Sequence, residues 1–474
     1  MNEELKINTQ SIALITGKQA WYYKVIPYNS LNGSICFYAP GKSCTNEIKT
    51  ELELLTNKKI IFEQIDSSII ENLLGKYYPN EQSDSRQQNE YYNGDADGFL
   101  THLIKEARLL KSSDIHIETF EEGCRVRIRI DGMLIQRYSL EKKQYPSLIN
   151  KIKIIANLDI AEKRLPQDGR IFFEFDQYKF DIRVSVLPTL HGEKIVLRLL
   201  NNDATDININ SLGFSDFDLN NYLESIKKPN GILLISGPTG SGKTTTLYAT
   251  LKLLNKETRN ILTIEDPIEY TLEGVNQVQL KENIGLTFAA ALRTFLRQDP
   301  DIIMLGEIRD AETANMAIRA ALTGHLVLST IHTNSAWGIV SRLIDMGVAP
   351  YLLANTLNTA IAQRLIRLLC VDCKEKTVMN ESLYPAKFKP YRKVEAHFIP
   401  KGCPHCYNTG YRGRKAVYEV LPIDDEFSEN IKEANYNVTD LIKSKGIKSL
   451  SENAFELFEQ GQTSVDEIYS LLMN

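Results

Sequence analysis

The sequence contains no run of 18 or more consecutive apolar residues, so we expect no helix that crosses a membrane. Its first residues, Met1 to Glu4, lack the basic and then apolar stretches of a secretion signal. Positive charge is not in excess either, because 55 Lys and Arg stand against 60 Asp and Glu and give a net charge of −5. This balance disfavours a nucleic-acid motor, although it leaves room for a local basic channel. We therefore expect a cytoplasmic protein that does not bind nucleic acid directly.

Cysteine is also scarce, with seven in 474 residues. In a chain without a secretion signal, the thiols are expected to be reduced and not paired in disulfides. Four of them nevertheless form two C-x-x-C pairs, Cys370 with Cys373 and Cys403 with Cys406. Two such pairs supply the four thiolates of a structural Zn²⁺ site, and four sulfur ligands leave no open position for catalysis. The alternatives are unrelated buried cysteines and, as a minor one, a ligand role for His405.

A chain of 474 residues is too long for one hydrophobic core. Near the N-terminus, apolar runs such as Trp21 to Val25 predict strands, and the Glu- and Leu-rich segment Asn46 to Leu55 predicts a helix. The polar stretch Asn201 to Asp206 predicts a hinge. The expected divisions are a partner-docking α+β domain at 1–80, a flexible linker at 81–97, a second α+β domain at 98–205, a parallel-sheet nucleotide-binding core at 206–369, a zinc module at 370–420 and a helical subdomain at 421–474.

One segment matches the pattern G-x-x-x-x-G-K-[ST] at every fixed position, between an apolar strand at 231–236 and a helix at 244–254. A glycine-rich turn in this position points backbone N–H groups at a bound polyphosphate. Lys243 can reach its β- and γ-phosphates, and the Thr244 hydroxyl can bind Mg²⁺. The residues expected to bind the nucleotide are Gly237, Pro238, Thr239, Gly240, Ser241, Gly242, Lys243, Thr244 and Thr245.

Two further apolar strands end in acidic residues. Ile302 to Leu305 leads through a glycine to Glu307, and Ile261 to Ile264 leads directly to Glu265. In P-loop proteins, an acid at the tip of a neighbouring strand holds Mg²⁺ or orients the attacking water. We expect Glu307 and Thr244 at the Mg²⁺ ion and Glu265 close by. Surface acids in turns are the alternative for either strand, and which of the two acids activates water stays open.

One histidine and four arginines are further candidates for contact with the bound nucleotide. His332 follows another expected strand and can donate hydrogen bonds at neutral pH, although most histidines are structural. Arg293 and Arg297 share one face of an expected helix, and Arg170 and Arg183 lie on expected strands of the preceding domain. Arginine suits a developing charge on phosphate because it is always ionised and can donate two hydrogen bonds to phosphate oxygens at once. A surface salt bridge is the default role for any single one of them.

Taken in order, these segments resemble the secretion and pilus-assembly ATPases of bacterial type II secretion and type IV pilus systems. The resemblance runs from about Gly98 to the C-terminus, and the glycine before Glu307 is itself a feature of that family. Its motifs are Ser113 to His116, Val126 to Gly132, Leu165 to Arg170, Arg183 to Pro188, the loop at 237–244, an Asp box at Ile264 to Glu269, a Walker B box at Gly306 to Asp310 and a His box at Thr323 to Asn334.

The resemblance implies an α/β fold in which an α+β, PAS-like domain and a small N-terminal α+β domain precede a RecA-like P-loop core, with a zinc-binding insertion and a helical C-terminal tail. It implies ATP hydrolysis with Mg²⁺ in a homo-hexamer. That hexamer would lie at the inner membrane through a platform protein and a membrane-anchored adaptor. Arg170 and Arg183, with Arg293 and Arg297, would close on the γ-phosphate, and His332 would sense it. The tetracysteine insertion is typical of assembly and export ATPases and generally absent from retraction motors.

Residues 1–80 match that family only loosely, so the partner they bind stays open. Two other functions remain alternatives. A DNA-uptake or conjugation-type ATPase is disfavoured by the acidic charge balance. A nucleotide-regulated scaffold with weak turnover is disfavoured by the presence of both Glu265 and Glu307.

Overall fold

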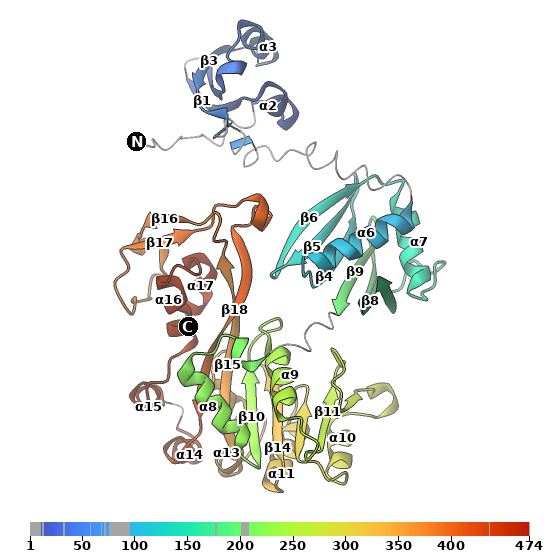
Figure 1. Cartoon of the computed structure of the whole chain (residues 1–474), viewed down its shortest axis with the longest axis vertical. Helices are drawn as coiled ribbons and strands as arrows, with labels where there is room; N and C mark the ends of the chain where they lie inside the picture. The colour runs from blue at the N-terminus through green and yellow to red at the C-terminus, as the bar shows by residue number, and fades with distance from the viewer. Residues whose placement is uncertain are drawn as a thin grey trace.

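In the residues that the computed structural model describes, the strands form four β-sheets. The three-stranded and seven-stranded sheets lie toward opposite ends of the long axis, with the six-stranded sheet between them (Figure 1). Among the described residues, no helix combines the length and apolar character that crossing a membrane requires. The expected hinge at 201–206 and most of the expected linker at 81–97 lie outside the described residues. The structure describes residues 11, 14–31, 34–56, 58–67, 69–70, 73–74, 95–175, 178–200, 208–435 and 437–473.

In the first sheet, β1 pairs antiparallel with β2, which pairs parallel with β3. The helix expected at 46–55 is confirmed, but the strand expected at Trp21 to Val25 is wrong because this segment belongs mostly to a helix. The Thr16 hydroxyl accepts a hydrogen bond from the backbone of Gln19, whose side chain accepts one from the backbone of Thr16. This capping box starts the helix, and Lys24 at φ 53° ends it. The elements are α2 (Gly17–Tyr23), β1 (Ile26–Leu31), β2 (Ser34–Ala39), α3 (Asn46–Thr56) and β3 (Lys59–Gln64).

The second sheet has the order β6-β5-β4-β9-β8-β7, and every neighbouring pair is antiparallel. Strand residues alternate between its faces: Ile115 and Ile117 are fully buried in the core formed with α6 and α7. On the other face, Glu118 pairs with Arg125 and Arg127. The elements are α6 (Ala96–Leu109), β4 (Asp114–Thr119), β5 (Cys124–Ile130), β6 (Met133–Leu140), α7 (Tyr145–Ile155), β7 (Gln167–Phe175), β8 (Tyr178–Thr189) and β9 (Gly192–Leu200).

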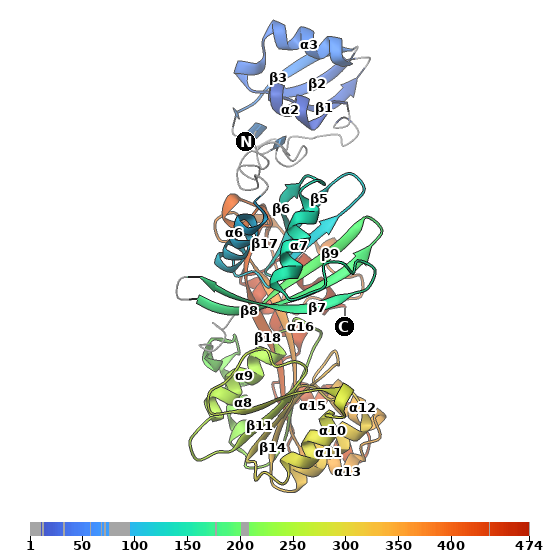
Figure 2. The ribbon, with the colours of Figure 1, turned by 90° about the vertical axis from the view of Figure 1, so that its right-hand side faces the viewer.

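The third sheet has the order β12-β11-β13-β14-β10-β15-β18 and is parallel except for β18. Helices α8 and α9 cover one face, and α10 to α13 cover the other (Figure 2). This parallel sheet brings the carboxyl ends of β10, β11, β13 and β14 to one edge. The elements are α8 (Asp216–Lys227), β10 (Gly231–Ser236), α9 (Lys243–Leu254), β11 (Ile261–Glu265), β12 (Asn276–Gln279), α10 (Phe288–Phe295), β13 (Ile302–Leu305), α11 (Ala311–Leu322), β14 (Leu326–Ile331), α12 (Gly338–Asp345), α13 (Pro350–Thr356), β15 (Leu357–Leu369) and β18 (Tyr411–Pro422).

Between β15 and β18 the chain forms a two-stranded sheet, and four helices follow β18. The tip of the β5–β6 hairpin contacts this region. The Asp131 carboxylate accepts a hydrogen bond of 2.7 Å from the backbone of Gly413 and lies 3.5 Å from Arg414, while Arg137 lies over the ring of Tyr407. The six-stranded sheet therefore touches β18 and the turn after Cys406. The elements are β16 (Glu375–Val378), β17 (Ala396–Ile399), α14 (Asp425–Lys432), α15 (Thr439–Ser444), α16 (Leu450–Glu459) and α17 (Val465–Leu472).

Candidate nucleotide and metal sites

The loop between β10 and α9 has the backbone shape of a phosphate cradle. Gly237 adopts φ 151°, and a Cβ atom there would lie 2.5 Å from the carbonyl oxygen of Gln363, so only glycine fits. Gly242 adopts φ 87° and caps α9, which begins at Lys243. The Lys243 ammonium donates hydrogen bonds to the carbonyls of Gly237 at 2.7 Å and Pro238 at 3.0 Å. The loop therefore curls around the lysine that is expected to bind phosphate.

The start of α9 supplies the anion-binding character of this loop. Lys243, Thr244 and Thr245 form the first turn, where backbone N–H groups have no partner within the helix. Burial lowers the pKa of Lys243, while the neighbouring Glu307 carboxylate raises it. The expected phosphate-binding residues Lys243, Thr244 and Thr245 therefore share the first turn of α9.

Glu307 follows β13 and lies close to both the loop and His332. Its carboxylate accepts a hydrogen bond from Arg309 and lies 3.6 Å from the imidazole Nε2 of His332. The hydrogen bond from Arg309 is the largest influence on the pKa of Glu307, and together with the charges of Arg309, His332 and Lys243 it lowers that pKa despite burial. An ionised carboxylate is the form that binds Mg²⁺. The structure therefore brings Lys243, Glu307 and His332 into one site.

Glu265 has a different environment, although it ends the strand next to β13. Only 3% of the residue is exposed. One carboxylate oxygen accepts hydrogen bonds from Thr263 at 2.6 Å and Gln277 at 3.1 Å, and the other accepts one from the Tyr248 hydroxyl. The two acids expected to share the chemistry are therefore held differently: Glu307 borders the loop, and Glu265 lies in the interior.

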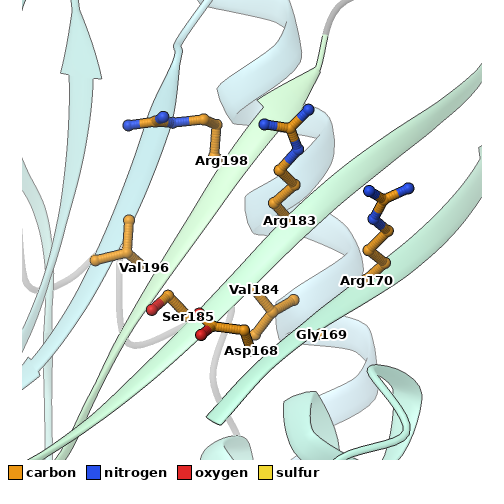
Figure 3. Close-up of a pocket in the computed structure, with 8 residues that line it drawn as sticks. All are labelled: Asp168, Gly169, Arg170, Arg183, Val184, Ser185, Val196 and Arg198. Atoms are coloured by element: carbon orange, nitrogen blue, oxygen red, sulfur yellow. The ribbon is translucent and has the colours of Figure 1, made fainter. Parts of the chain in front are cut away.

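Arg170 and Arg183 face each other across β7 and β8, and Arg198 on β9 faces Arg183 from the other side. All three line a cavity of about 510 Å³ (Figure 3). Arg183 also reaches the nucleotide-binding core. Its guanidinium donates a 2.7 Å hydrogen bond to the carbonyl of Ile268 and lies 3.8 Å from Glu269. Arg183 thus contacts the loop that follows Glu265.

Arg293 and Arg297 have local partners in this structure. Arg293 on α10 pairs with Glu312 of α11. Arg297 donates a 2.8 Å hydrogen bond to the carbonyl of Arg293, one turn back along the chain. These two arginines lie on the α10 side of the sheet, whereas Arg170 and Arg183 belong to the six-stranded sheet.

Two residues of β15 border the loop and were missed by sequence reasoning. Gln363 is buried, donates a 2.8 Å hydrogen bond to the carbonyl of Ser241 and accepts one from Thr246. Arg364 next to it donates to the Asn334 side chain at 3.3 Å, within the expected His box. The sequence carried a signal for both, because a Gln-Arg pair interrupts an otherwise apolar run. Arg198, Tyr248 and Gln277 were also missed, and each lies in an ordinary strand or helix pattern without a motif of its own.

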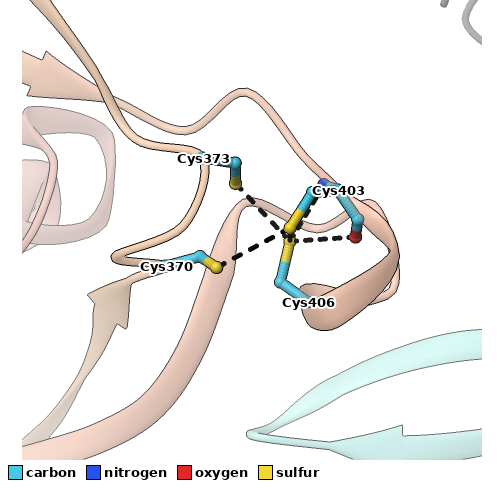
Figure 4. A group of neighbouring side chains, drawn as sticks. All are labelled: Cys370, Cys373, Cys403 and Cys406. Atoms are coloured by element: carbon cyan, nitrogen blue, oxygen red, sulfur yellow. Dashed lines mark hydrogen bonds between the residues drawn. The ribbon is translucent and has the colours of Figure 1, made fainter.

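The four paired cysteines form one cluster, although they come from two separate turns (Figure 4). Their Sγ atoms all lie within 4.8 Å of one another, and three of the pairs are separated by 3.7 to 3.9 Å. Zn–S bonds of about 2.3 Å in a tetrahedron put sulfur atoms roughly 3.8 Å apart, so the cluster fits such an ion. His405 lies 3.1 Å from Asp372 instead, which leaves Cys370, Cys373, Cys403 and Cys406 as the ligand set.

The sequence is similar to those of known secretion and pilus ATPases. Residues 93–470 match the family model described as type II/IV secretion system protein. The type II secretion system ATPase E of Vibrio cholerae is 40% identical over 463 residues, covering 92% of this chain and 91% of that protein. The type IV pilus assembly ATPase PilB of Myxococcus xanthus is 46% identical over 383 residues, covering 77% of this chain and 66% of that protein.

A solved structure, the pilus retraction motor PilT with bound ADP, superposes with a TM-score of 0.54 at 26% identity. It covers 78% of this chain and 95% of the PilT chain. The family-model match over residues 93–470 includes the six-stranded sheet, the loop at 237–245 and the parallel sheet. The chain belongs to the type II/IV secretion system protein family, and it is an ATPase of that family.

Proposed function

We propose that this protein hydrolyses ATP at residues 237–245 and uses the energy to assemble a pilin-like filament, as part of a type II secretion or type IV pilus machine. The observation that carries the proposal is the meeting of Lys243, Glu307 and His332 at one edge of the parallel sheet. The two relatives named above are described as ATPases of these two systems. The tetracysteine cluster, expected in assembly motors, supports assembly over retraction.

Each residue has a distinct task in the proposed site. Thr244 and Glu307 would hold Mg²⁺, which withdraws charge from the phosphate oxygens when it is bound. Lys243 now donates to backbone carbonyls and would donate to phosphate oxygens instead. His332, beside Glu307, would donate a hydrogen bond to the terminal phosphate and report its presence. Glu265 and Glu307 together would orient water and metal.

The proposal also assigns roles to the four arginines, to the cysteine module, to the C-terminal helices and to residues 1–80. Arg170 and Arg183 would approach the terminal phosphate when the 98–205 domain moves against the 206–369 core, with Arg293 and Arg297 arriving from the α10 side. The module at 370–420 would hold Zn²⁺ through its four cysteines, and the helical subdomain at 421–474 would close the core. We further propose a homo-hexamer at the cytoplasmic face of the inner membrane. A platform protein and a membrane-anchored adaptor would hold it there, the adaptor through residues 1–80.

Lys243→Ala tests the site directly. We expect ATP turnover to be lost while the protein remains folded, because the substitution removes the cation and leaves the glycine-rich loop intact. Turnover is measured as phosphate release, and folding by circular dichroism and thermal unfolding. Lys252→Ala, on an exposed side of the same helix, is the control and should keep full turnover. Undiminished turnover in Lys243→Ala would overturn the site assignment.

A further inference from the structure

Strand β11 determines where the Glu265 side chain points. Leu262 and Ile264 belong to the core beneath α10 to α13, whereas Ile261 belongs to the core shared with α9. Because side chains alternate along a strand, Thr263 and Glu265 share the α9 side with Ile261. The carboxylate of Glu265 thus enters the layer between the sheet and α9, where the Tyr248 hydroxyl meets it.

Three donors hold this carboxylate, and we call Tyr248, Thr263 and Gln277 the Glu265 clamp. The donors engage both carboxylate oxygens, and the residue is 3% exposed. A buried carboxylate is stable only when hydrogen bonds replace its lost hydration. An attacking water or a nucleotide therefore cannot reach Glu265 in this conformation, whereas Glu307 influences the pKa of Lys243 directly.

The clamp also holds the loop that follows Glu265. The Gln277 amide donates to the carbonyl of Tyr270 at 3.1 Å and accepts from the backbone of Leu272 at 2.7 Å. The rings of Tyr248 and Tyr270 pack with their centroids 4.1 Å apart. From the other domain, Arg183 donates to the carbonyl of Ile268 in the same loop. Tyr248 and Gln277 therefore contact both the carboxylate of Glu265 and the loop that follows it.

We propose that Tyr248 and Gln277 are positioning residues that withhold the Glu265 carboxylate from the nucleotide until the loop at 266–272 moves. The inference rests on the proposed ATPase function, in which Glu265 takes part in orienting water. Because Arg183 contacts the same loop, displacement of the six-stranded sheet removes one restraint on the loop and favours release. The clamp thus keeps the isolated chain slow and makes turnover depend on the position of the preceding domain.

Tyr248→Phe tests the clamp, since it removes one hydroxyl and keeps the ring packed against Tyr270. We expect the kcat for ATP to rise by about 10- to 100-fold, within the range that loss of one hydrogen bond to a carboxylate allows. The KM should stay unchanged because the loop at 237–245 is untouched. Tyr222→Phe is the matched control: Tyr222 is also fully buried, and its hydroxyl lies 2.5 Å from Thr250 without contacting Glu265. Its kcat should equal that of the native protein.

A second pair of variants separates the possible failures. In a Glu265→Gln background, Tyr248→Phe should no longer raise kcat, because the carboxylate it releases is absent. A folded Tyr248→Phe protein with unchanged or lower kcat overturns the clamp. If Tyr248→Phe does not fold, Gln277→Leu decides by the same criterion. If Glu265→Gln alone keeps native turnover, Glu265 has no role in hydrolysis, and both that proposal and the clamp fail. If Glu265→Gln is inactive but Tyr248→Phe leaves kcat unchanged, the role of Glu265 stands and only the clamp fails.

Discussion

Glu265 ends β11 and Glu307 follows the neighbouring strand β13, yet the residues around each carboxylate differ. Glu307 accepts a hydrogen bond from Arg309 and lies near His332 and Lys243. Glu265 is surrounded by a tyrosine, a threonine and a glutamine. At the scale of single residues, the two carboxylates therefore differ in the groups that donate hydrogen bonds to them. The donor to Glu307 is a cation, whereas the donors to Glu265 are neutral side chains.

The cationic environment of Glu307 predicts a pH dependence. Arg309 lowers the pKa of Glu307, so the carboxylate stays ionised until the pH falls below the usual range of glutamate. Removing the hydrogen bond and the charge in Arg309→Met should raise this pKa, because the largest influence that lowers it is lost while burial, which raises it, remains. Activity that needs ionised Glu307 is lost as pH falls through its pKa, so the acid limb of kcat should move to higher pH. Arg319→Met, at the exposed end of α11, is the control. An acid limb that stays in place would contradict the assignment.

At the scale of structural elements, we expect the two cysteine turns to depend on a metal ion for their stability. The stretch between them contains only the short strands β16 and β17 and one 3-10 turn at Glu381–Leu383. Metal binding to four thiolates contributes roughly 10 kcal/mol to folding in small zinc modules. We expect Cys370→Ser with Cys373→Ser to release about one zinc per chain and to increase hydrogen exchange across 370–420. Elemental analysis and exchange mass spectrometry measure the two effects.

Cys124→Ser is the matched control for this experiment. Cys124 is buried, as Cys370 is, but lies on β5, where its thiol contacts Thr119. Its replacement should leave the zinc content unchanged. Native protein without zinc by elemental analysis would refute the metal assignment.

At the scale of the whole molecule, the β5–β6 hairpin joins the six-stranded sheet to β18. Asp131 accepts from the backbone of Gly413 and pairs with Arg414, so one carboxylate bridges two domains. Asp131→Ala should increase hydrogen exchange at both sides of this contact, in residues 130–138 and 407–414. Glu121→Gln, in the exposed turn before β5, is the control. Unchanged exchange in Asp131→Ala would show that the contact does not hold the domains together.

Local patterns predicted much of this molecule. The glycine-rich loop, the acids after β11 and β13 and the paired cysteines were all found from spacing, because each depends on neighbouring residues and on the alternation of strand and helix. The error at Trp21 to Val25 also has a local cause: aromatic residues suggested a strand, whereas the capping box at Thr16 and Gln19 starts a helix. The capping residues were visible in the sequence and outweigh the aromatic composition.

By itself, the sequence predicted a polyphosphate-binding loop at 237–244 and four cysteines able to share one ion, since both predictions depend on short spacings. Only the tertiary structure decided that Gln363 and Arg364 border the loop, that Arg183 contacts the loop after Glu265, and that Glu265 is buried while Glu307 is only partly buried. The physical reason is that such contacts join residues far apart in the chain. They depend on the order of strands in a sheet and on which face each side chain takes.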